Sequence, residues 1–389
     1  MVYNPIQSAL HLLHQASTPA GFVAAVEEHD NYKRVWTRDG TVCSIAALLS
    51  GDEGLIATAK ATIETLFSHQ HANGIMPSNV TPGSNKVSYG GIVGRADNPS
   101  WAVIGLCQYT LITGDSSLAN QFSTEVEKCF SVLDIWEYNG KHLIYVPQSG
   151  DWADEYIQHG YILFEQLLRL WALRLAAKVY NRDDWAQKAA IITTTIQNNY
   201  WLQPDASKLY NPHWDARYKE AFKGYWLMGF NPARAYHYFD LQANALALIL
   251  KIGTKEQDES VTNWVQNVYK ERWNNMLPSF YPTILDGDDD MKELTGNYAY
   301  TFRNKPYQFH NGGLWAVWNG WMVAGLVSAG KQELAKSLTT AIHKANHANE
   351  SNFNECLHGL TQQPCGVPQC AWSAAGAIIA EETLAGRKL

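Results

Sequence analysis

Long apolar runs with a helical repeat alternate with polar loops along most of the chain. Apolar residues recur at spacings of three and four in residues 40–70, 161–180, 241–253 and 314–345, which is typical of packed helices. Alternation of apolar and polar positions, the mark of a half-buried strand, is scarce. The pattern therefore predicts an all-α protein built from paired helices.

The segments between these runs are unlike ordinary connectors, because they are rich in Trp, Asn, Gly and carboxylates. They recur about every 60 residues, roughly the length of a helical hairpin with its loops. There are six of these regions: 33–40, 71–80 with 88–101, 146–156, 210–218, 281–290 with 307–315, and 352–359. Six hairpins predict a toroid, an (α/α)6 barrel, with the aromatic loops gathered at one end.

The composition indicates a single domain and argues against nucleic acid and membranes as partners. The chain has 389 residues, yet no Pro/Gly/Ser tract or charge run marks a linker, so residues 1–389 are interpreted as a single domain. The net charge of −7 comes with no basic cluster, which argues against nucleic acid as a partner. No stretch approaches the roughly 20 apolar residues needed to span a bilayer, and no signal peptide is evident. We expect no membrane association and a cytoplasmic location.

Two clusters could suggest a metal, and neither fits well. One has a spacing that matches no paired C-x₂-C pattern; it contains Cys356, His358, Cys365 and Cys370. The acidic run Asp286–Asp290 follows a Gly-containing turn, which suits a surface loop better than the helical aspartate clusters that hold magnesium and diphosphate. We therefore expect no metal and no organic cofactor, although an ion on the acidic run stays open.

The segment SGDWADEYIQHGY, residues 149–161, carries candidate chemistry. Hydrolysis of a glycosidic bond needs a carboxylic acid to protonate the leaving oxygen and a carboxylate opposite it. Asp154 is the candidate acid, because Trp152 and Tyr156 could desolvate it and raise its pKa. Glu355 is the candidate base, in the last polar loop. The simpler alternatives are a helix N-cap for Asp151 or Asp154 and an exposed loop acid for Glu355.

Other loop residues suit the binding of sugar hydroxyls and ring faces. Aromatic rings cover the C–H face of a pyranose, although many of these rings could instead fill the barrel. Arg38 and Asp39 lie beside Trp36 in VWTRDG, where the charged pair could hold vicinal hydroxyls. The remaining candidates for substrate binding come from four of the loops: Asp97, Asn98, Trp101, Asp151, Trp152, His310, Asn311 and Trp315.

These motifs, in the order VWTRDG, YGGIVGRADNPSW, GDWADEYIQHGY, YQFHNGGLW and NFNECLHG, resemble those of the alkaline/neutral invertases. More loosely they are similar to the wider six-hairpin glycosidases, which include glucoamylases, trehalases and debranching-type α-glucosidases. The resemblance covers residues 32 to 384. It implies an inverting hydrolase with Asp154 as general acid and Glu355 as general base. It also implies sugar subsites lined by Trp36, Arg38, Asp39, Asp97, His310 and Asn311.

The sequence departs from the invertase pattern beside both candidate carboxylates. The invertases follow their acid with two arginines, where this chain has Glu155 and Tyr156. They surround their base with Trp-Pro and Tyr-Tyr, where this chain has Phe353-Asn354 and Cys356-Leu357. The resemblance therefore supports fold and reaction type more strongly than it supports sucrose as substrate.

The leading hypothesis is an inverting, exo-acting glycoside hydrolase on a small sucrose-like or α-glucosidic saccharide. The sequence leaves open the sugar, the linkage, the leaving group and the oligomeric state. An alternative is a sugar epimerase or isomerase on the same barrel, which would transfer protons through His310 and His358. A third is a noncatalytic sugar-binding or partner-binding barrel.

Overall fold

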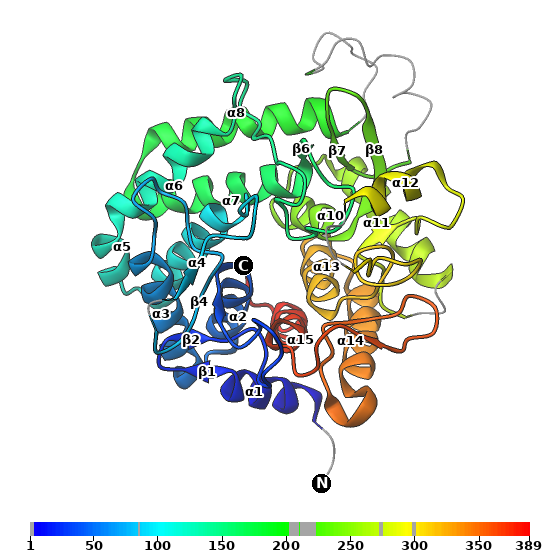
Figure 1. Cartoon of the computed structure of the whole chain (residues 1–389), viewed down its shortest axis with the longest axis horizontal. Coiled ribbons are helices and arrows are strands. Elements are labelled where there is room, and N and C mark those ends of the chain that lie inside the picture. Colours follow the sequence, from blue (N-terminus) through cyan, green and yellow to red (C-terminus); the bar gives the residue numbers. More distant parts are fainter. Residues whose placement is uncertain (1–3, 85, 202–209, 211–222, 272–274, 298–300) are drawn as a thin grey trace.

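Six helices form a closed inner ring in the computed structural model, which describes residues 4–84, 86–201, 210, 223–271, 275–297 and 301–389 (Figure 1). Each inner helix packs on the next, and the last packs on both its predecessor and the first. In order these are α2 (Thr37–Ser50), α4 (Asn98–Thr113), α7 (Leu163–Tyr180), α10 (Leu241–Ile249), α13 (Ala316–Ser328) and α15 (Ala371–Leu384). The predicted all-α class and (α/α)6 barrel are confirmed.

An outer layer of amphipathic helices covers this ring. Along α11 the buried residues fall three and four apart, at Val261, Val265, Val268 and Tyr269, while charged residues face water. By contrast, every residue of α2 from Thr37 to Leu49 is buried. The outer helices are α1 (Pro5–Gln15), α3 (Glu53–Ser68), α6 (Ser123–Ile135), α8 (Asp183–Tyr200), α11 (Lys255–Glu271) and α14 (Gln332–Ser351), and α5 (Ser117–Gln121) and α12 (Asp289–Gly296) are short additions.

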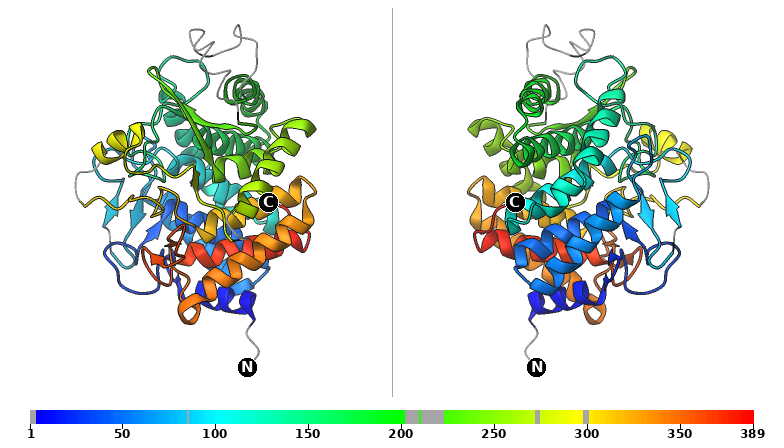
Figure 2. Two further views of the ribbon diagram at one scale, coloured as in Figure 1. Left: turned by 90° about the vertical axis from the view of Figure 1, so that its right-hand side faces the viewer. Right: turned by 90° about the vertical axis from the view of Figure 1, so that its left-hand side faces the viewer.

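Because inner and outer helices alternate along the chain, the inner helices all run in the same direction. Their N-termini therefore share one end of the ring, and the side views show loops and short strands gathered there (Figure 2). Of the six polar loops, the one at 210–218 lies outside the described residues except for Tyr210. No helix in the described part of the chain is long and apolar enough to cross a lipid bilayer.

Short antiparallel strands decorate this end, which the apolar pattern did not predict. Most contain two residues, too few to produce a period-two signal. They form four small sheets: β1 (Ser17–Thr18) with β2 (Gly21–Phe22); β3 (Val35–Trp36), β4 (Asn79–Val80) and β5 (Val87–Ser88); β6 (Tyr161–Ile162), β7 (Leu227–Phe230), β8 (Ala235–Asp240) and β9 (Phe280–Tyr281); and β10 (Cys356–Leu357) with β11 (Pro364–Cys365). The strands fix the loops that precede the inner helices, because β3 leads directly into α2, β6 into α7 and β8 into α10.

Candidate active site

A cavity of about 710 Å³ opens at the N-terminal end of the inner helices. Its walls combine charged groups with aromatic rings, which is the chemistry that sugar hydroxyls and sugar ring faces require. The lining includes Tyr32, Trp36, Arg38, Asp39, Arg95, Trp152, Asp154, Arg303, His310, Trp315, Glu355 and Trp372. The two candidate catalytic carboxylates thus lie on the same cavity.

Glu355 lies immediately before β10 and is buried and firmly held. The Tyr32 hydroxyl donates a hydrogen bond of 2.7 Å to Oε1. The backbone N–H of Val367 donates one of 3.2 Å to Oε2. Burial raises the pKa of the Glu355 carboxyl to about 7, although both hydrogen bonds favour its ionised form. This carboxyl therefore changes charge near neutral pH.

Asp154, unlike Glu355, is partly exposed and is held by an arginine. Its side chain is 35 % exposed, and its Oδ2 atom is 2.5 Å from Nη2 of Arg95. Of the two rings expected to desolvate Asp154, Trp152 lines the cavity but Tyr156 does not. The Tyr156 ring stacks instead on Phe280, with ring centroids 4.4 Å apart. The candidate acid is therefore held in an ion pair at the wall of the cavity.

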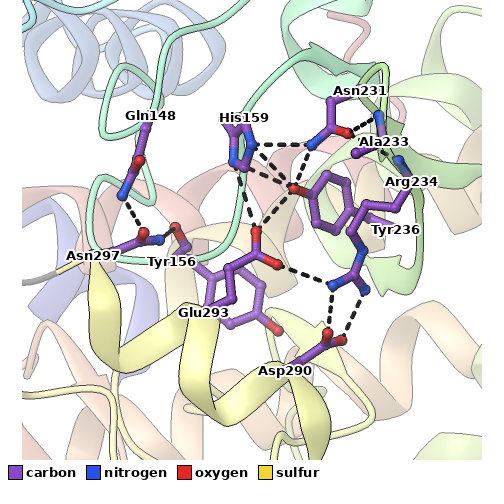
Figure 3. Close-up of polar contacts among 10 residues, drawn as sticks. All are labelled: Gln148, Tyr156, His159, Asn231, Ala233, Arg234, Tyr236, Asp290, Glu293 and Asn297. Carbon is purple, nitrogen blue, oxygen red and sulfur yellow. Dashed lines mark hydrogen bonds and ion pairs between the residues drawn. The ribbon is translucent and has the colours of Figure 1, made fainter.

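The loop that carries Asp154 is fixed from behind by amide side chains. Asn297, just after α12, donates a hydrogen bond of 2.7 Å to the carbonyl of Tyr156 and contacts Gln148 (Figure 3). Asn304 donates another of 2.7 Å to the carbonyl of Glu155. The two residues that follow Asp154 are therefore anchored through their backbone, which limits where its carboxyl can point.

The network in Figure 3 also accounts for part of the acidic run. Arg234 holds Asp290 through two contacts, of 2.5 and 3.0 Å, and the Tyr238 hydroxyl donates to the same carboxylate. Within the described residues, no group of three or more His, Cys, Asp or Glu side chains could hold a metal ion. The cysteines of the other candidate cluster are free thiols.

The matching family model is that of alkaline and neutral invertase, over residues 186–386, which is just over half of the chain. The chain belongs to this family. It is 22 % identical to alkaline/neutral invertase C, mitochondrial, of Arabidopsis thaliana, over 84 % of this chain and 58 % of that protein. Cytosolic invertase 1 of Oryza sativa subsp. japonica is 23 % identical, over 82 % and 65 % respectively. The chain thus spans about three-fifths of the length of these relatives.

Solved structures with the same fold extend the comparison. The GH63 mannosylglycerate hydrolase from Thermus thermophilus, in complex with Tris, has a TM-score of 0.69 at 13 % identity, covering 97 % of this chain and 99 % of that one. A bacterial glucoamylase complexed with acarbose has a TM-score of 0.66 at 13 % identity, covering 99 % and 56 %. At such low identity these similarities concern the fold alone.

The other motifs expected from the invertase family divide into cavity walls and supports. Trp36, Arg38 and Asp39 line the cavity, and burial raises the pKa of Asp39 to about 6 although Arg38 opposes the rise. Asp97 lies behind them, fully buried, with its Oδ2 atom 2.5 Å from Nε of Arg38. Asn98 donates to the carbonyl of Pro77, and Trp101 is completely buried among other rings.

The same division applies to the remaining candidates. Trp152, His310 and Trp315 line the cavity, and the His310 and Trp315 rings stack with centroids 5.5 Å apart. Burial lowers the pKa of His310 to about 3. Asn311 is fully buried and bridges loops, because it accepts from the N–H of Ile284 and donates to its carbonyl.

Asp151 is also fully buried. Burial, together with the nearby Asp97 carboxylate, raises its pKa to about 7. Neither Asp151 nor Asp154 caps α7, because that helix begins at Leu163 with Ile162 as its N-cap.

Several cavity residues were not singled out from the sequence, among them Tyr32, Arg95, Arg303 and Trp372. Tyr32 lies five residues before α2, and Trp372 is in the first turn of α15. Arg95 belongs to the loop 88–101, which its composition had already marked as unusual. A search for polar or aromatic residues within five positions of the inner-helix starts would have found these three. Arg303 precedes its helix by more than ten residues, so position along the chain gives no signal for it.

Proposed function

We propose that this chain is an inverting, exo-acting glycoside hydrolase of small sucrose-like or α-glucosidic saccharides, with Asp154 as general acid and Glu355 as general base. The observation that carries the proposal is the meeting of these two carboxylates on one cavity lined by aromatic rings and arginines. Membership of the invertase family supports hydrolysis as the reaction class. The name of the GH63 neighbour, a mannosylglycerate hydrolase, is in keeping with a hydrolase on this fold.

In the proposed reaction, Glu355 accepts a proton from a water molecule while the oxygen of that water attacks the anomeric carbon. The bond from the anomeric carbon to the leaving oxygen breaks, and that oxygen takes the proton of Asp154. Hydrogen bonds from Tyr32 and Val367 occupy one site on each Glu355 oxygen and orient the carboxylate. Because its pKa is about 7, Glu355 is a strong base for a carboxylate and is ionised at neutral to alkaline pH.

The sugar that is released would be bound by the walls around these carboxylates. In this assignment Trp36, Trp152 and Trp315 contact ring faces, while Arg38, Asp39 and His310 bind hydroxyls. The other candidates act as supports, since Asp97 holds Arg38 at 2.5 Å and Asn311 joins two loops. Asn98, Trp101 and Asp151 lie in the buried layer behind the cavity.

The isomerase alternative is less well supported. It requires two histidines facing one substrate, and His358 is absent from the residues that line the cavity. Its Nδ1 atom accepts from the backbone N–H of Leu360. His310, whose pKa is lowered to about 3, would stay neutral and could not act as an acid at neutral pH.

Three further points belong to the proposal. Residues 1–389 act as one domain, a small carbohydrate is the partner, and the location is cytoplasmic. The relatives include one named as cytosolic and others named as mitochondrial or chloroplastic. No metal or organic cofactor is required by the two-carboxylate chemistry.

The experiment is a proton NMR time course with sucrose, trehalose, maltose and isomaltose, observed in the anomeric region during the first minutes. We expect one of them to release a sugar whose first anomer is opposite to that of the bond cut. Release of the same anomer would contradict inversion. Incorporation of solvent deuterium into recovered free glucose or fructose, without hydrolysis, would instead identify an isomerase.

A further inference from the structure

A second pocket of about 510 Å³ lies beside the catalytic cavity, on the other side of Arg95. One wall is the glycine-rich loop of residues 89–96. The opposite wall is formed by rings from the segment after α6, with Pro147 from the loop that leads to Asp154. The side chains that matter here are Tyr89, Ile92, Val93, Trp136, Tyr138 and Tyr145.

Aromatic rings line this pocket as they line the catalytic cavity, but it has far fewer charged side chains. Arg95 is the one charged side chain among the described residues that line it. Its guanidinium is already used by three acceptors: Asp154 at 2.5 Å, the carbonyl of Gly94 at 3.0 Å and the carbonyl of Ser149 at 3.1 Å. A sugar ring needs several partners for its hydroxyls, whereas an apolar ring needs only contact area. The four aromatic rings and the single, already paired charge therefore favour an uncharged occupant that carries a ring of its own.

The lip of the pocket exposes apolar groups that a ligand would cover. Ile92 is 94 % exposed at the tip of its loop, and Tyr138 is 73 % exposed on the facing wall. Single exposed apolar residues are common, but Ile92 and Tyr138 line the same pocket, so a ligand there would cover both. The Tyr138 ring already packs edge-on against Tyr145 with centroids 6.4 Å apart, which leaves its outer face free for a second ring.

Arg95 connects the two pockets, because it lines both of them. It also makes the ion pair with Asp154, the proposed proton donor to the leaving oxygen. A leaving group whose oxygen lies at Asp154 would therefore have Arg95 as a neighbour, and the second pocket begins at the same arginine.

We propose that this second, aromatic-lined pocket binds the leaving group of a substrate, and that this leaving group is an alcohol carrying an aromatic ring. The inference rests on the proposed hydrolase function and adds to its saccharide substrates a second class: the glycoside of an aryl-substituted alcohol. Water supplies the oxygen that bonds to the anomeric carbon, and the bond from that carbon to the leaving oxygen breaks. The alcohol leaves with the proton of Asp154, and Glu355 keeps the proton taken from water.

The pocket is tested first by binding, which does not depend on catalysis. The probe is 2-(2-naphthyl)ethanol, followed by its fluorescence when it is titrated with wild-type protein, Ile92→Ser, Tyr138→Ser and the matched control Ile135→Ser. Ile135 is 69 % exposed and does not line the pocket. We expect saturable binding, weakened about five- to tenfold by each of the first two changes and unaffected by the control. Absence of saturable binding, or equal weakening by the control, would overturn the proposal.

The second measurement compares leaving groups of similar acidity on the sugar that the NMR screen identifies. The 2-phenylethyl glycoside should be cleaved with a kcat/KM at least tenfold above that of the ethyl glycoside, and Tyr138→Ser should reduce this ratio about tenfold. Equal rates for the two glycosides would overturn the proposal while leaving the hydrolase function intact. Naphthylethanol binding without cleavage of any glycoside would instead support the pocket and reject the hydrolase.

A third outcome concerns another occupant of the same surface. If Ile92→Ser and Tyr138→Ser change the molecular mass in light scattering, while binding of naphthylethanol is unaffected, the exposed lip is an interface with a second copy of the chain. That result would overturn the leaving-group assignment.

Discussion

The two proposed catalytic carboxylates, Glu355 and Asp154, are held in different ways by the walls of the cavity. Glu355 is buried, accepts hydrogen bonds from Tyr32 and Val367, and has a pKa raised to about 7. Asp154 is partly exposed, and an arginine from a glycine-rich loop neutralises it. The candidate base is therefore held by hydrogen bonds inside the fold, whereas the candidate acid is held by an ion pair with a side chain that itself lines the cavity.

The two carboxylates therefore depend on different parts of the protein. The pKa of Glu355 is set by the fold itself, since both of its hydrogen-bond donors belong to the protein. The position of the Asp154 carboxyl depends instead on its contact with Arg95, which lines the cavity that would hold a substrate. The following experiments test this contrast.

Removing either carboxylate should have the largest effect. We expect Glu355→Gln and Asp154→Asn each to lower kcat by roughly 10²- to 10⁴-fold, because general acid and base contributions are of that order. Initial rates on the saccharide found by NMR measure the loss, and circular dichroism checks that the variants fold. Near-normal activity in either variant would reject its role.

The same Glu355→Gln change should stabilise the protein at neutral pH. The folded-state pKa of Glu355, about 7, lies above its ordinary value of 4.5, so folding favours the protonated form. Stability is then lost as pH rises from about 4.5 through about 7, and glutamine avoids this loss. We expect a gain of roughly 2–3 kcal/mol at pH 8 and little change at pH 4.

Urea unfolding of the wild type and the variant at the two pH values measures this gain. A gain that is equal at pH 4 and pH 8 would mean that burial of the Glu355 charge is not its cause.

The pH dependence of activity should reflect the ionisation of the buried Glu355 carboxyl. The base must be ionised, so kcat/KM should fall tenfold per pH unit below about 7. Tyr32→Phe removes a donor that favours the ionised carboxylate. The pKa of Glu355 should then rise further, and the acidic limb of the profile should move to higher pH. A shift to lower pH would contradict this account of Tyr32.

The smallest effect is expected for the ion pair on the exposed wall. Arg95→Gln should change the free energy of unfolding by less than about 1 kcal/mol, because an ion pair with a partly exposed carboxylate is screened by water. Asp97→Asn, which disturbs the buried partner of Arg38, is the contrasting variant and should cost considerably more. Chemical denaturation at neutral pH compares the two. Equal costs would show that Arg95 and Asp154 are coupled more tightly than their exposure suggests.

The sequence predicted the framework well because the inner and outer helices leave different patterns in it. Helices buried all round, such as α2 and α13, contain long apolar stretches with a few buried polar residues, and amphipathic helices such as α11 bury residues three and four apart. The strands of two residues left no pattern to detect. The loops before the inner helices were recognisable by composition alone.

Within the candidate site, the sequence identified the loops better than the orientation of individual side chains. Asp39 and Asp97 come from similar motifs, yet one lines the cavity and the other supports Arg38 from behind. Trp101 and Trp315 likewise separate into a core ring and a wall ring. Such choices depend on contacts between loops far apart in the chain, as with Tyr32 and Glu355, and local pattern does not encode them.

The hydrogen bond from Tyr32 to Glu355 joins segments 323 residues apart. Tyr32 precedes α2, the first helix of the inner ring, and Glu355 precedes α15, the helix that closes the ring against it. During synthesis Tyr32 is therefore made early, and nearly the whole chain has to be synthesised before Glu355 can accept its hydrogen bond. A chain that ends before residue 355 lacks this hydrogen bond, so the candidate base is held in place only when the last part of the ring is present.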